Sequence, residues 1–260
     1  MFPLATQLTS LAAAAALVVT SSVAADAAAL APIDAAAAVA AATAPAAPSA
    51  PVAPVARVVP GLTPQLITAA AEAGLGAEVL TLGLRAHERV RTAGLTDRSI
   101  VTIVDYSRLS RERRLWVLDV ATGEVLAHEL VAHGRNTGGD RAERFSNREG
   151  SYQSSIGTFV TGATYTGKHG HSLRLKGLDQ GLNDNAMARA IVIHGADYVN
   201  DGIVGQLGRL GRSLGCPALA PAAAKRVIDL ISDGTTFFAY YPAPELAATF
   251  PGAETEIAAQ

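Results

Sequence analysis

Residues 191–219 read IVIHGADYVNDGIVGQLGRLGRSLGCPAL, and this stretch decides how the chain has to fold. The apolar run 190–193 predicts a strand that brings His194 to a turn containing glycine. A loop dense in glycine and arginine then leads to Cys216, the only cysteine of the chain, between a glycine and a proline. Because such neighbours make a turn rather than a core strand, they favour a reactive thiol over an inert buried one. A thiol and a base are the two parts that a cysteine nucleophile needs.

A catalytic role for Cys216 and His194 requires that neighbouring groups position the imidazole and accept its protons. His194 has to accept the proton of the thiol and later return it to a leaving amine. The second nitrogen of the imidazole needs a partner, which is either a main-chain carbonyl near Gly195 or the side chain of Asp197. The sequence leaves both possibilities open.

The oxyanion of a tetrahedral intermediate needs backbone N–H donors. Since Pro217 has no N–H, we expect these donors at Cys216 and at Gly215 or Leu214 before it. Arg212 is close enough in the chain to bind a substrate carboxylate, and a plain surface charge is the alternative.

Elsewhere the hydrophobic pattern predicts a β-sheet core with helices at both flanks. Helices are expected within 61–92, with a break at Gly74, and from Pro221 to Gly234. Short runs rich in β-branched residues predict about seven strands without βαβ alternation, so antiparallel hairpins are the default. The strand ranges are 100–104, 115–120, 125–131, 157–164, 172–175, 190–193 and 236–241. The predicted fold class is mainly β (α+β).

Other features have simpler interpretations. His87 and Trp116 lie on predicted core faces, and Arg111–Arg114 is expected to form a solvated cluster of charges at a turn. Residues 135–150 are expected to form a polar loop, and 166–171 to separate two strands.

The ends of the chain differ in composition from the middle. Residues 11–19 form an apolar run of signal-peptide length that is too short to span a bilayer, and small residues suited to cleavage follow it. Residues 26–60 are nearly all Ala, Pro and Val, which predicts an extended tether. The predicted organisation is a signal peptide (1–25), a disordered linker (26–60), a helical segment (61–98), a catalytic domain (99–245) and a tail (246–260).

These features predict export to the periplasm or cell envelope, with no membrane span once the signal is removed. The leader lacks Lys and Arg, so an Ala-rich disordered start or a wrong start codon is the alternative. The formal net charge is −2 and nothing resembles a nucleic-acid footprint. A single cysteine also excludes an internal disulfide.

The site residues resemble a known family. His194-Gly195 followed by Ser213-x-Gly215-Cys216 is similar to the signature of murein L,D-transpeptidases with a YkuD-type catalytic domain, and most similar to the branch with Pro after the cysteine. The resemblance covers most of 99–240 and includes YTGKHGHSLRLKGLDQGLNDNAMARAIVIHGADYV (165–199), VAHGRNTG (131–138), FSN (145–147) and Ser154-Ser155.

The resemblance implies a β-sandwich or barrel in which Cys216 is the nucleophile and His194 the base, with Gly195 beside it. The thiolate would attack the carbonyl of the third residue of a peptidoglycan stem peptide and expel the terminal D-alanine. An amine of another stem would resolve the thioester as a 3→3 crosslink, and water would make the protein an L,D-carboxypeptidase. Family members need no cofactor or metal, and many are acylated by carbapenems.

This chain departs from the commonest family pattern at two positions. Ala218 stands where Arg or Asn is usual, and Leu214 where His is frequent. Substrate contacts therefore have to come from other residues. The candidate oxyanion and substrate-binding residues are Gly215, Leu214, Ser213, Arg212, Tyr165, Lys168 and His169.

Three other functions are alternatives to this one. His169, His171, His194 and Cys216 could supply zinc donors, although no ligand-spacing motif supports this. A secreted, non-catalytic wall-binding module would use Cys216 only structurally. A papain-like protease places Cys before His along the chain, which is the opposite of the order here.

Overall fold

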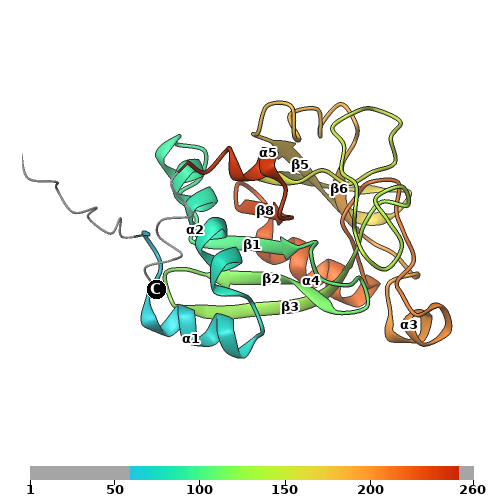
Figure 1. Cartoon of the computed structure of the whole chain (residues 1–260), viewed down its shortest axis with the longest axis horizontal. Helices are drawn as coiled ribbons and strands as arrows, with labels where there is room; N and C mark the ends of the chain where they lie inside the picture. The colour runs from blue at the N-terminus through green and yellow to red at the C-terminus, as the bar shows by residue number, and fades with distance from the viewer. Residues whose placement is uncertain (1–58, 252–260) are drawn as a thin grey trace, which may run out of the picture. The chain divides into compact units, whose positions relative to one another are not determined.

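Eight strands close into a barrel in the computed structural model, which describes residues 59–251 (Figure 1). Their bounds are β1 Ile100–Asp105, β2 Arg113–Asp119, β3 Glu124–Ala132, β4 Gly157–Gly167, β5 Gly170–Gly177, β6 Val192–Gly195, β7 Ala218–Leu219 and β8 Thr236–Tyr240. The strand order around the barrel is β1-β2-β3-β7-β6-β5-β4-β8. The mainly β class is therefore confirmed. The predicted signal peptide, nearly all of the linker and residues 252–260 lie outside the described residues.

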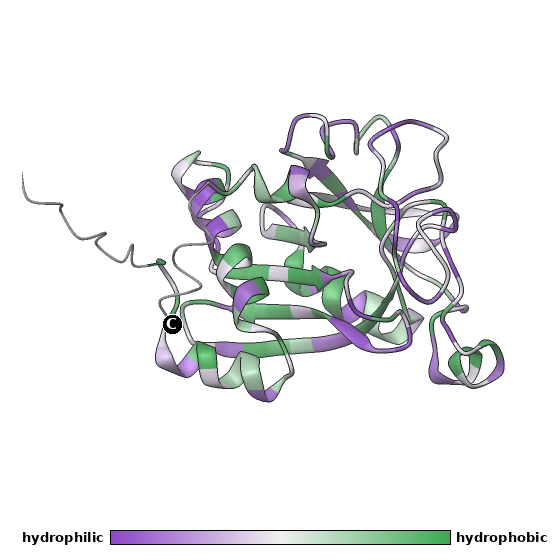
Figure 2. Cartoon of the chain, in the orientation of Figure 1, coloured by the Kyte–Doolittle hydropathy of each residue, from purple (hydrophilic) through white to green (hydrophobic). Residues whose placement is uncertain are grey.

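Most neighbouring strands are antiparallel, as the hairpin pattern predicts. Two pairs, β1–β8 and β6–β7, run parallel, and they join segments that are distant in the sequence. The β6–β7 pair is the one that brings the two ends of 191–219 together. The strands are coloured mostly hydrophobic in Figure 2, in keeping with the fully buried pattern of β1 and β8.

The N-terminal helices form where the sequence signals place them. In α1 (Pro64–Glu72) the Thr63 side chain accepts a hydrogen bond from the N–H of Leu66, and proline occupies the first turn. The helix α2 (Ala77–Thr92) packs on β1 and β8. Its His87 is buried and its Nδ1 lies 2.9 Å from the Thr236 hydroxyl, so the prediction of a core histidine is confirmed.

The C-terminal part holds the predicted helix α4 (Pro221–Ile231), which packs on β6 and buries Ala224, Val227, Ile228 and Ile231. A short helix, α5 (Pro244–Ala247), follows β8, and both Leu246 and Phe250 are buried in the core. These two residues fall within the tail predicted for 246–260, so the ordered packing continues at least that far.

Residues 201–207 form a helix, α3 (Asp201–Leu207), where a loop was predicted. The Asn200 side chain accepts a hydrogen bond from the N–H of Ile203, and Gly208 ends the helix with φ 67°. None of its residues is buried, so the sequence contains no apolar stripe that would indicate a helix here. The hairpin between β4 and β5 is also longer than predicted, and Lys168 and His169 alone form its turn.

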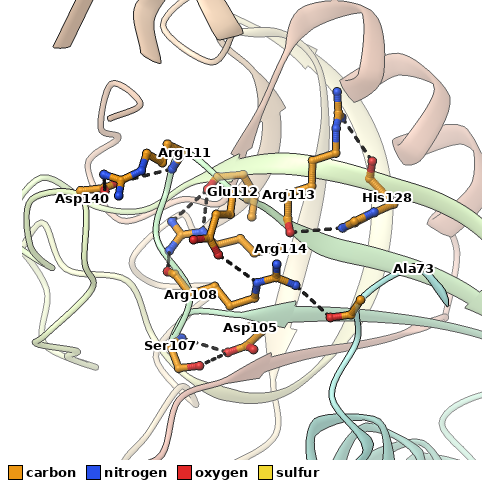
Figure 3. A network of polar contacts seen from close by, with 12 residues as sticks. Ala73, Asp105, Ser107, Arg108, Arg111, Glu112, Arg113, Arg114, His128 and Asp140 are labelled. Atoms are coloured by element: carbon orange, nitrogen blue, oxygen red, sulfur yellow. Dashed lines mark hydrogen bonds and ion pairs between the residues drawn. The ribbon is translucent and has the colours of Figure 1, made fainter. Parts of the chain in front are cut away.

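The prediction of a solvated cluster at 111–114 is wrong for Arg114, whose side chain is completely buried in β2. Its Nε and Nη2 donate to the Val131 carbonyl, and Nη1 donates to the carbonyl of Arg108. Burial lowers the pKa of Arg114 to about 10, so it stays charged at neutral pH. The side chains of Arg111 and Arg113 are exposed. Figure 3 shows Arg111 paired with Asp140.

Candidate active site

The β-ladder determines how close His194 and Cys216 lie. His194 in β6 is paired with Ala218 in β7, two residues after Cys216. Cys216 lies in the bend directly before β7, so this pairing brings the thiol turn to the end of β6 that carries His194. The two ends of 191–219 meet, as the sequence predicts.

The imidazole of His194 is buried and oriented by its own backbone neighbour. Its Nδ1 lies 2.9 Å from the carbonyl oxygen of Gly195, so Nδ1–H donates to that oxygen and Nε2 is left unprotonated. Burial lowers the pKa of His194, and the nearby charges of His169 and Lys168 act in the same direction. The choice between Gly195 and Asp197 is thus made in favour of the Gly195 carbonyl.

The thiol of Cys216 is half-buried, and its Sγ lies 3.7 Å from the carbonyl oxygen of Ala190. Burial raises the pKa of this thiol above its ordinary value. A hydrogen bond with the backbone of Val192 and the positive charges of Arg189 and Lys168 oppose that effect. The thiol and the imidazole are therefore both neutral at rest.

The turn before the thiol is fixed by two serines. Ser213 Oγ donates to the carbonyl of Cys216 at 2.6 Å and accepts from the N–H of Gly215 at 3.0 Å. Ser154 Oγ donates to the carbonyl of Gly215 and accepts from the N–H of Gly134. Ser213 thus shapes the turn. The N–H of Gly215 is already used, which narrows the expected oxyanion donors to Cys216 and Leu214.

The backbones of Gly134 and Gly215, the residue before the thiol, pass close to one another. A Cβ on Gly134 would lie 2.5 Å from the Tyr152 carbonyl oxygen and 2.9 Å from the Cα of Gly215. Gly215 itself has φ 126°, a conformation that other residues rarely adopt. Both positions therefore require glycine, and together they determine where the nucleophile is held.

Arg189 is a site residue that the sequence reasoning missed. Its guanidinium donates to the carbonyls of Ser146 and Gln153 and to the hydroxyl of Ser155, at 2.5–2.6 Å. It also contributes positive charge next to Cys216. Arg189 therefore connects the loop before β4 to the thiol. It lies inside the stretch 165–199, but nothing in its local pattern marks it.

The hairpin turn between β4 and β5 extends to the base. The ring of His169 stacks on that of His194, with centroids 4.4 Å apart and an interplanar angle of 27°. Tyr165 pairs across the sheet with Ser172, which in turn pairs with His194. Of the predicted substrate residues, Lys168 and His169 are therefore adjacent to the base, and Tyr165 lies two strands away.

The remaining candidates have separate places. Arg212 donates through Nη1 to the carbonyls of Arg135 and Gly138 and so holds the loop that follows β3. Leu214 is 54% exposed beside the thiol, where an apolar side chain can contact a bound molecule. Ala218, at the position of the missing family Arg or Asn, is completely buried.

A cavity of about 540 Å³ adjoins the base. Neither His194 nor Cys216 is among the residues that line it. Its walls are formed by the hairpin turn, the residues after His194 and one face of α4. The lining residues are Lys168, His169, His171, Gly195, Ala196, Asp197, Tyr198, Pro221, Ala224 and Lys225. The cavity therefore neighbours His194 through His169, which stacks on its ring, and through Gly195, the next residue of the chain.

The four proposed zinc donors are not gathered at one point. His171 faces Asp229 of α4 at 3.1 Å, whereas His169 stacks on His194. Among residues 59–251, no group of three or more His, Cys, Asp or Glu side chains is arranged to hold a metal ion. Within the same range no helix is long and apolar enough to cross a membrane.

Comparison with known proteins gives one family. Residues 71–240 match the model of the L,D-transpeptidase catalytic domain. Similar solved structures include an L,D-transpeptidase from Mycobacterium smegmatis (18% identity, TM-score 0.35, 55% of this chain and 59% of that one). L,D-transpeptidase 3 from Mycobacterium tuberculosis is 12% identical with a TM-score of 0.36, and the match covers 55% of this chain and 61% of that one. The L,D-transpeptidase from Xylanimonas cellulosilytica is 16% identical with a TM-score of 0.31, and the match covers 59% of this chain and 68% of that one. This chain thus spans about three fifths of the length of the first two. The curated proteins contain no match.

Proposed function

Since this chain belongs to the family of L,D-transpeptidase catalytic domains, we propose that it cleaves the L-centre–D-Ala bond of a peptidoglycan stem tetrapeptide through Cys216 and transfers the acyl group to an amine. The product would be a 3→3 crosslink. The observation that carries this proposal is the hydrogen bond from His194 Nδ1 to the Gly195 carbonyl, because it leaves Nε2 free to take a proton. The pairing of His194 with Ala218 brings the thiol turn to the same end of the sheet.

The first half-reaction uses the thiol and the imidazole as a neutral pair. The thiol proton moves to His194 Nε2, and the sulfur attacks the carbonyl carbon of the third stem residue. In the resting structure the thiol faces the Ala190 carbonyl, so a side-chain rotation precedes this transfer. The N–H groups of Cys216 and Leu214 are the donors for the oxyanion. The imidazolium then protonates the leaving amine of D-alanine, which leaves a thioester on Cys216.

The second half-reaction decides between two activities. An incoming amine gives the crosslink, and water gives an L,D-carboxypeptidase from the same site. A non-catalytic wall-binding protein is the further alternative, and it differs in needing no thiol. Muropeptide analysis of sacculi treated with the protein separates these functions: new 3→3 dimers mean transfer, shortened stems mean hydrolysis, and neither product means binding alone.

Acylation by a carbapenem tests the nucleophile directly. We expect intact-mass spectrometry to show one covalent adduct on the wild type and none on Cys216→Ser, because the alkoxide needed from serine is far less accessible than a thiolate. An unmodified wild-type mass after prolonged incubation would contradict the proposal. His194→Ala is expected to retain the fold and lose most of the acylation rate.

The substrate of this reaction lies outside the cytoplasm, so the proposal includes export by residues 1–25 with residues 26–60 as a tether. N-terminal sequencing of protein recovered from the cell envelope tests this. A mature N-terminus near residues 24–26 supports it, and an intact Met1 on envelope protein speaks against it.

A further inference from the structure

The peptide group between Gly215 and Cys216 is the central one of the thiol turn. Its N–H belongs to Cys216 and is one of the two expected oxyanion donors, whereas its carbonyl belongs to the buried Gly215. No peptide bond among residues 59–251 is cis, and in a trans peptide the N–H and the C=O point in opposite directions. The group that binds the carbonyl therefore decides where the N–H points. That group is Ser154, whose Oγ donates to the Gly215 carbonyl at 3.0 Å.

Steric contacts alone do not fix the orientation of this peptide group. Gly215 has no Cβ and a φ of 126°, so the peptide plane that follows it can rotate with little resistance. Ser213 binds the two neighbouring peptide groups, through the N–H of Gly215 and the carbonyl of Cys216, and makes no hydrogen bond to the central one. Within residues 59–251 the N–H of Cys216 has no acceptor, so it is available to a substrate oxygen. The direction of this donor therefore depends on Ser154.

The direction of the Ser154 hydroxyl follows from its partners. A serine hydroxyl donates one hydrogen bond and accepts two. The N–H of Gly134 donates to Ser154 Oγ at 3.0 Å, and the side chain of the buried Tyr106 also hydrogen-bonds to this hydroxyl. Because the Gly215 carbonyl can only accept, the one proton of the hydroxyl goes to that carbonyl. The phenol of Tyr106 is then a second donor to Ser154.

Ser154 is itself held from outside the thiol turn. It is buried, its N–H donates to Thr137 Oγ1 at 2.7 Å, and its carbonyl accepts from the N–H of Ser146 at 3.0 Å. Both partners lie in the connection between β3 and β4. The position of the hydroxyl therefore does not depend on the turn that it supports.

We propose that Ser154 is a positioning residue for acylation: through the Gly215 carbonyl it aims the N–H of Cys216 at the oxyanion. The proposal deepens the proposed function and rests on it. Ser154 acts through a main-chain peptide group and needs no contact with the substrate. Its hydroxyl also polarises that peptide group, which makes the N–H of Cys216 a stronger donor.

Two reactions of the same thiol separate this role from a structural one. When a carbapenem acylates Cys216, the S–C bond forms while the carbonyl oxygen takes the negative charge, and the charge leaves that oxygen when the C–N bond breaks. When iodoacetamide alkylates Cys216, an S–C bond forms and iodide leaves without an oxyanion. Both reactions need the thiolate, but only acylation needs the N–H donor.

The test compares the two rate constants in Ser154→Ala. We expect the acylation rate constant at saturating carbapenem to fall about tenfold to hundredfold, since loss of an aimed oxyanion donor has effects of this size or larger. The carbapenem concentration that gives half of the maximal rate and the alkylation rate constant are expected to stay within about twofold of the wild type, because ground-state binding and the thiolate are not affected. Ser154→Thr keeps the hydroxyl and should recover most of the acylation rate.

Thr161 provides a matched control. Its buried hydroxyl also makes two main-chain bonds, accepting from the N–H of Thr235 at 2.8 Å and donating to the Thr235 carbonyl at 3.3 Å. Thr161→Val is therefore expected to lower the midpoint of urea unfolding much as Ser154→Ala does. Its ratio of acylation to alkylation should remain that of the wild type.

The remaining outcomes are distinguishable. A Ser154→Ala variant that does not fold, or that loses both reactions equally, assigns Ser154 to the fold alone and overturns the proposal. A wild-type ratio in folded Ser154→Ala, or the same loss of ratio in Thr161→Val, overturns it as well. A wild type that is alkylated by iodoacetamide but forms no carbapenem adduct refutes the proposed function itself.

Discussion

The carbonyl of Gly195 determines which nitrogen of His194 can act. A ring that donates from Nδ1 offers Nε2 as the base, and no acidic side chain is required for this. The absence of a negative partner has an electrostatic consequence. Burial and the neighbouring His169 and Lys168 lower the pKa of His194, and no carboxylate opposes them.

This lowered pKa predicts the pH dependence of acylation. Below the pKa the ring is an imidazolium and cannot accept a proton, so the rate falls with decreasing pH only once the pH is below 6.5, the ordinary value for histidine. Stopped-flow measurement of carbapenem acylation against pH checks this. A fall in rate between about pH 8 and 6.5 would contradict it. His194→Ala has to rely on the small thiolate fraction of Cys216, so its rate is expected to be slow and to rise with pH throughout the neutral range, because burial raises the pKa of that thiol.

The charge of Arg189 gives a second prediction, about the reactivity of the Cys216 thiol. Its charge opposes the effect of burial on the pKa of Cys216, so Arg189→Met should raise that pKa further and slow alkylation by iodoacetamide at a fixed pH by about threefold to tenfold. Arg189→Lys keeps the charge and should lie closer to the wild type. An alkylation midpoint that is the same in Arg189→Met and the wild type would contradict this role.

Single residues were predictable where their type is chemically rare. One cysteine and one histidine at a strand end are visible in the sequence, and the structure brings their segments together. Arg189 was not predictable, because its role depends on a loop more than thirty residues earlier in the chain. Arg114 was misassigned for a similar reason: its acceptors are main-chain carbonyls, which leave no signal in a sequence.

At the scale of elements, the loop after β3 and the thiol turn are held together by two glycines. Gly134→Ala would place a methyl group 2.5 Å from a carbonyl oxygen and 2.9 Å from the Cα of Gly215. We expect a loss of about 1–3 kcal/mol in the free energy of unfolding, together with slower acylation of Cys216 because the turn shifts.

Gly139 supplies the control for this substitution. A Cβ there meets nothing within 4 Å, so Gly139→Ala should leave both stability and acylation nearly unchanged. Urea unfolding and adduct formation measure the two quantities. Equal behaviour of the two alanine variants would show that the contact between Gly134 and Gly215 is unimportant.

The elements themselves were predictable in proportion to their length and periodicity. Caps and prolines located α1 and α4, and β-branched runs located the longer strands. β7 has only two residues, which is too short for any periodic pattern. α3 lacks a buried face, and its start and stop residues, Asn200 and Gly208, are equally common in loops.

At the scale of the whole molecule, stability should depend on a buried histidine. His133 is fully buried with its Nδ1 2.8 Å from Arg114 Nη2, and burial and this charge lower its pKa to about 4. An unfolded histidine titrates near 6.5. Between these values only the unfolded state binds the proton, so stability is full above pH 6.5 and is lost as the pH falls toward 4.

The expected loss over this range is about 3 kcal/mol from His133 alone, since one pKa unit corresponds to about 1.4 kcal/mol. His87 and His194 have lowered pKa values too and act in the same direction. Chemical denaturation at a series of pH values measures the slope. His133→Asn should flatten it, and an unchanged slope in that variant would contradict the assignment.

The closed barrel as a whole could be predicted only as a mainly β core. Antiparallel hairpins join strands that are neighbours in the sequence, so local patterns predict them. The parallel contacts of β1 with β8 and of β6 with β7 join segments that no local pattern relates, and these two contacts close the barrel and position the site. The likeness of residues 99–240 to a known family supplied what periodicity could not.

The pairing of β6 with β7 means that the chain between them does not set the spacing of the reacting groups. α3 lies in this connection and buries none of its residues. A protein cut between Gly205 and Gln206 by an engineered protease site would then consist of two fragments, one contributing the imidazole and the other the sulfur, held in register by the barrel. Such a nicked protein is expected to stay associated and reactive, and it would allow each half of the reaction centre to be labelled or replaced independently.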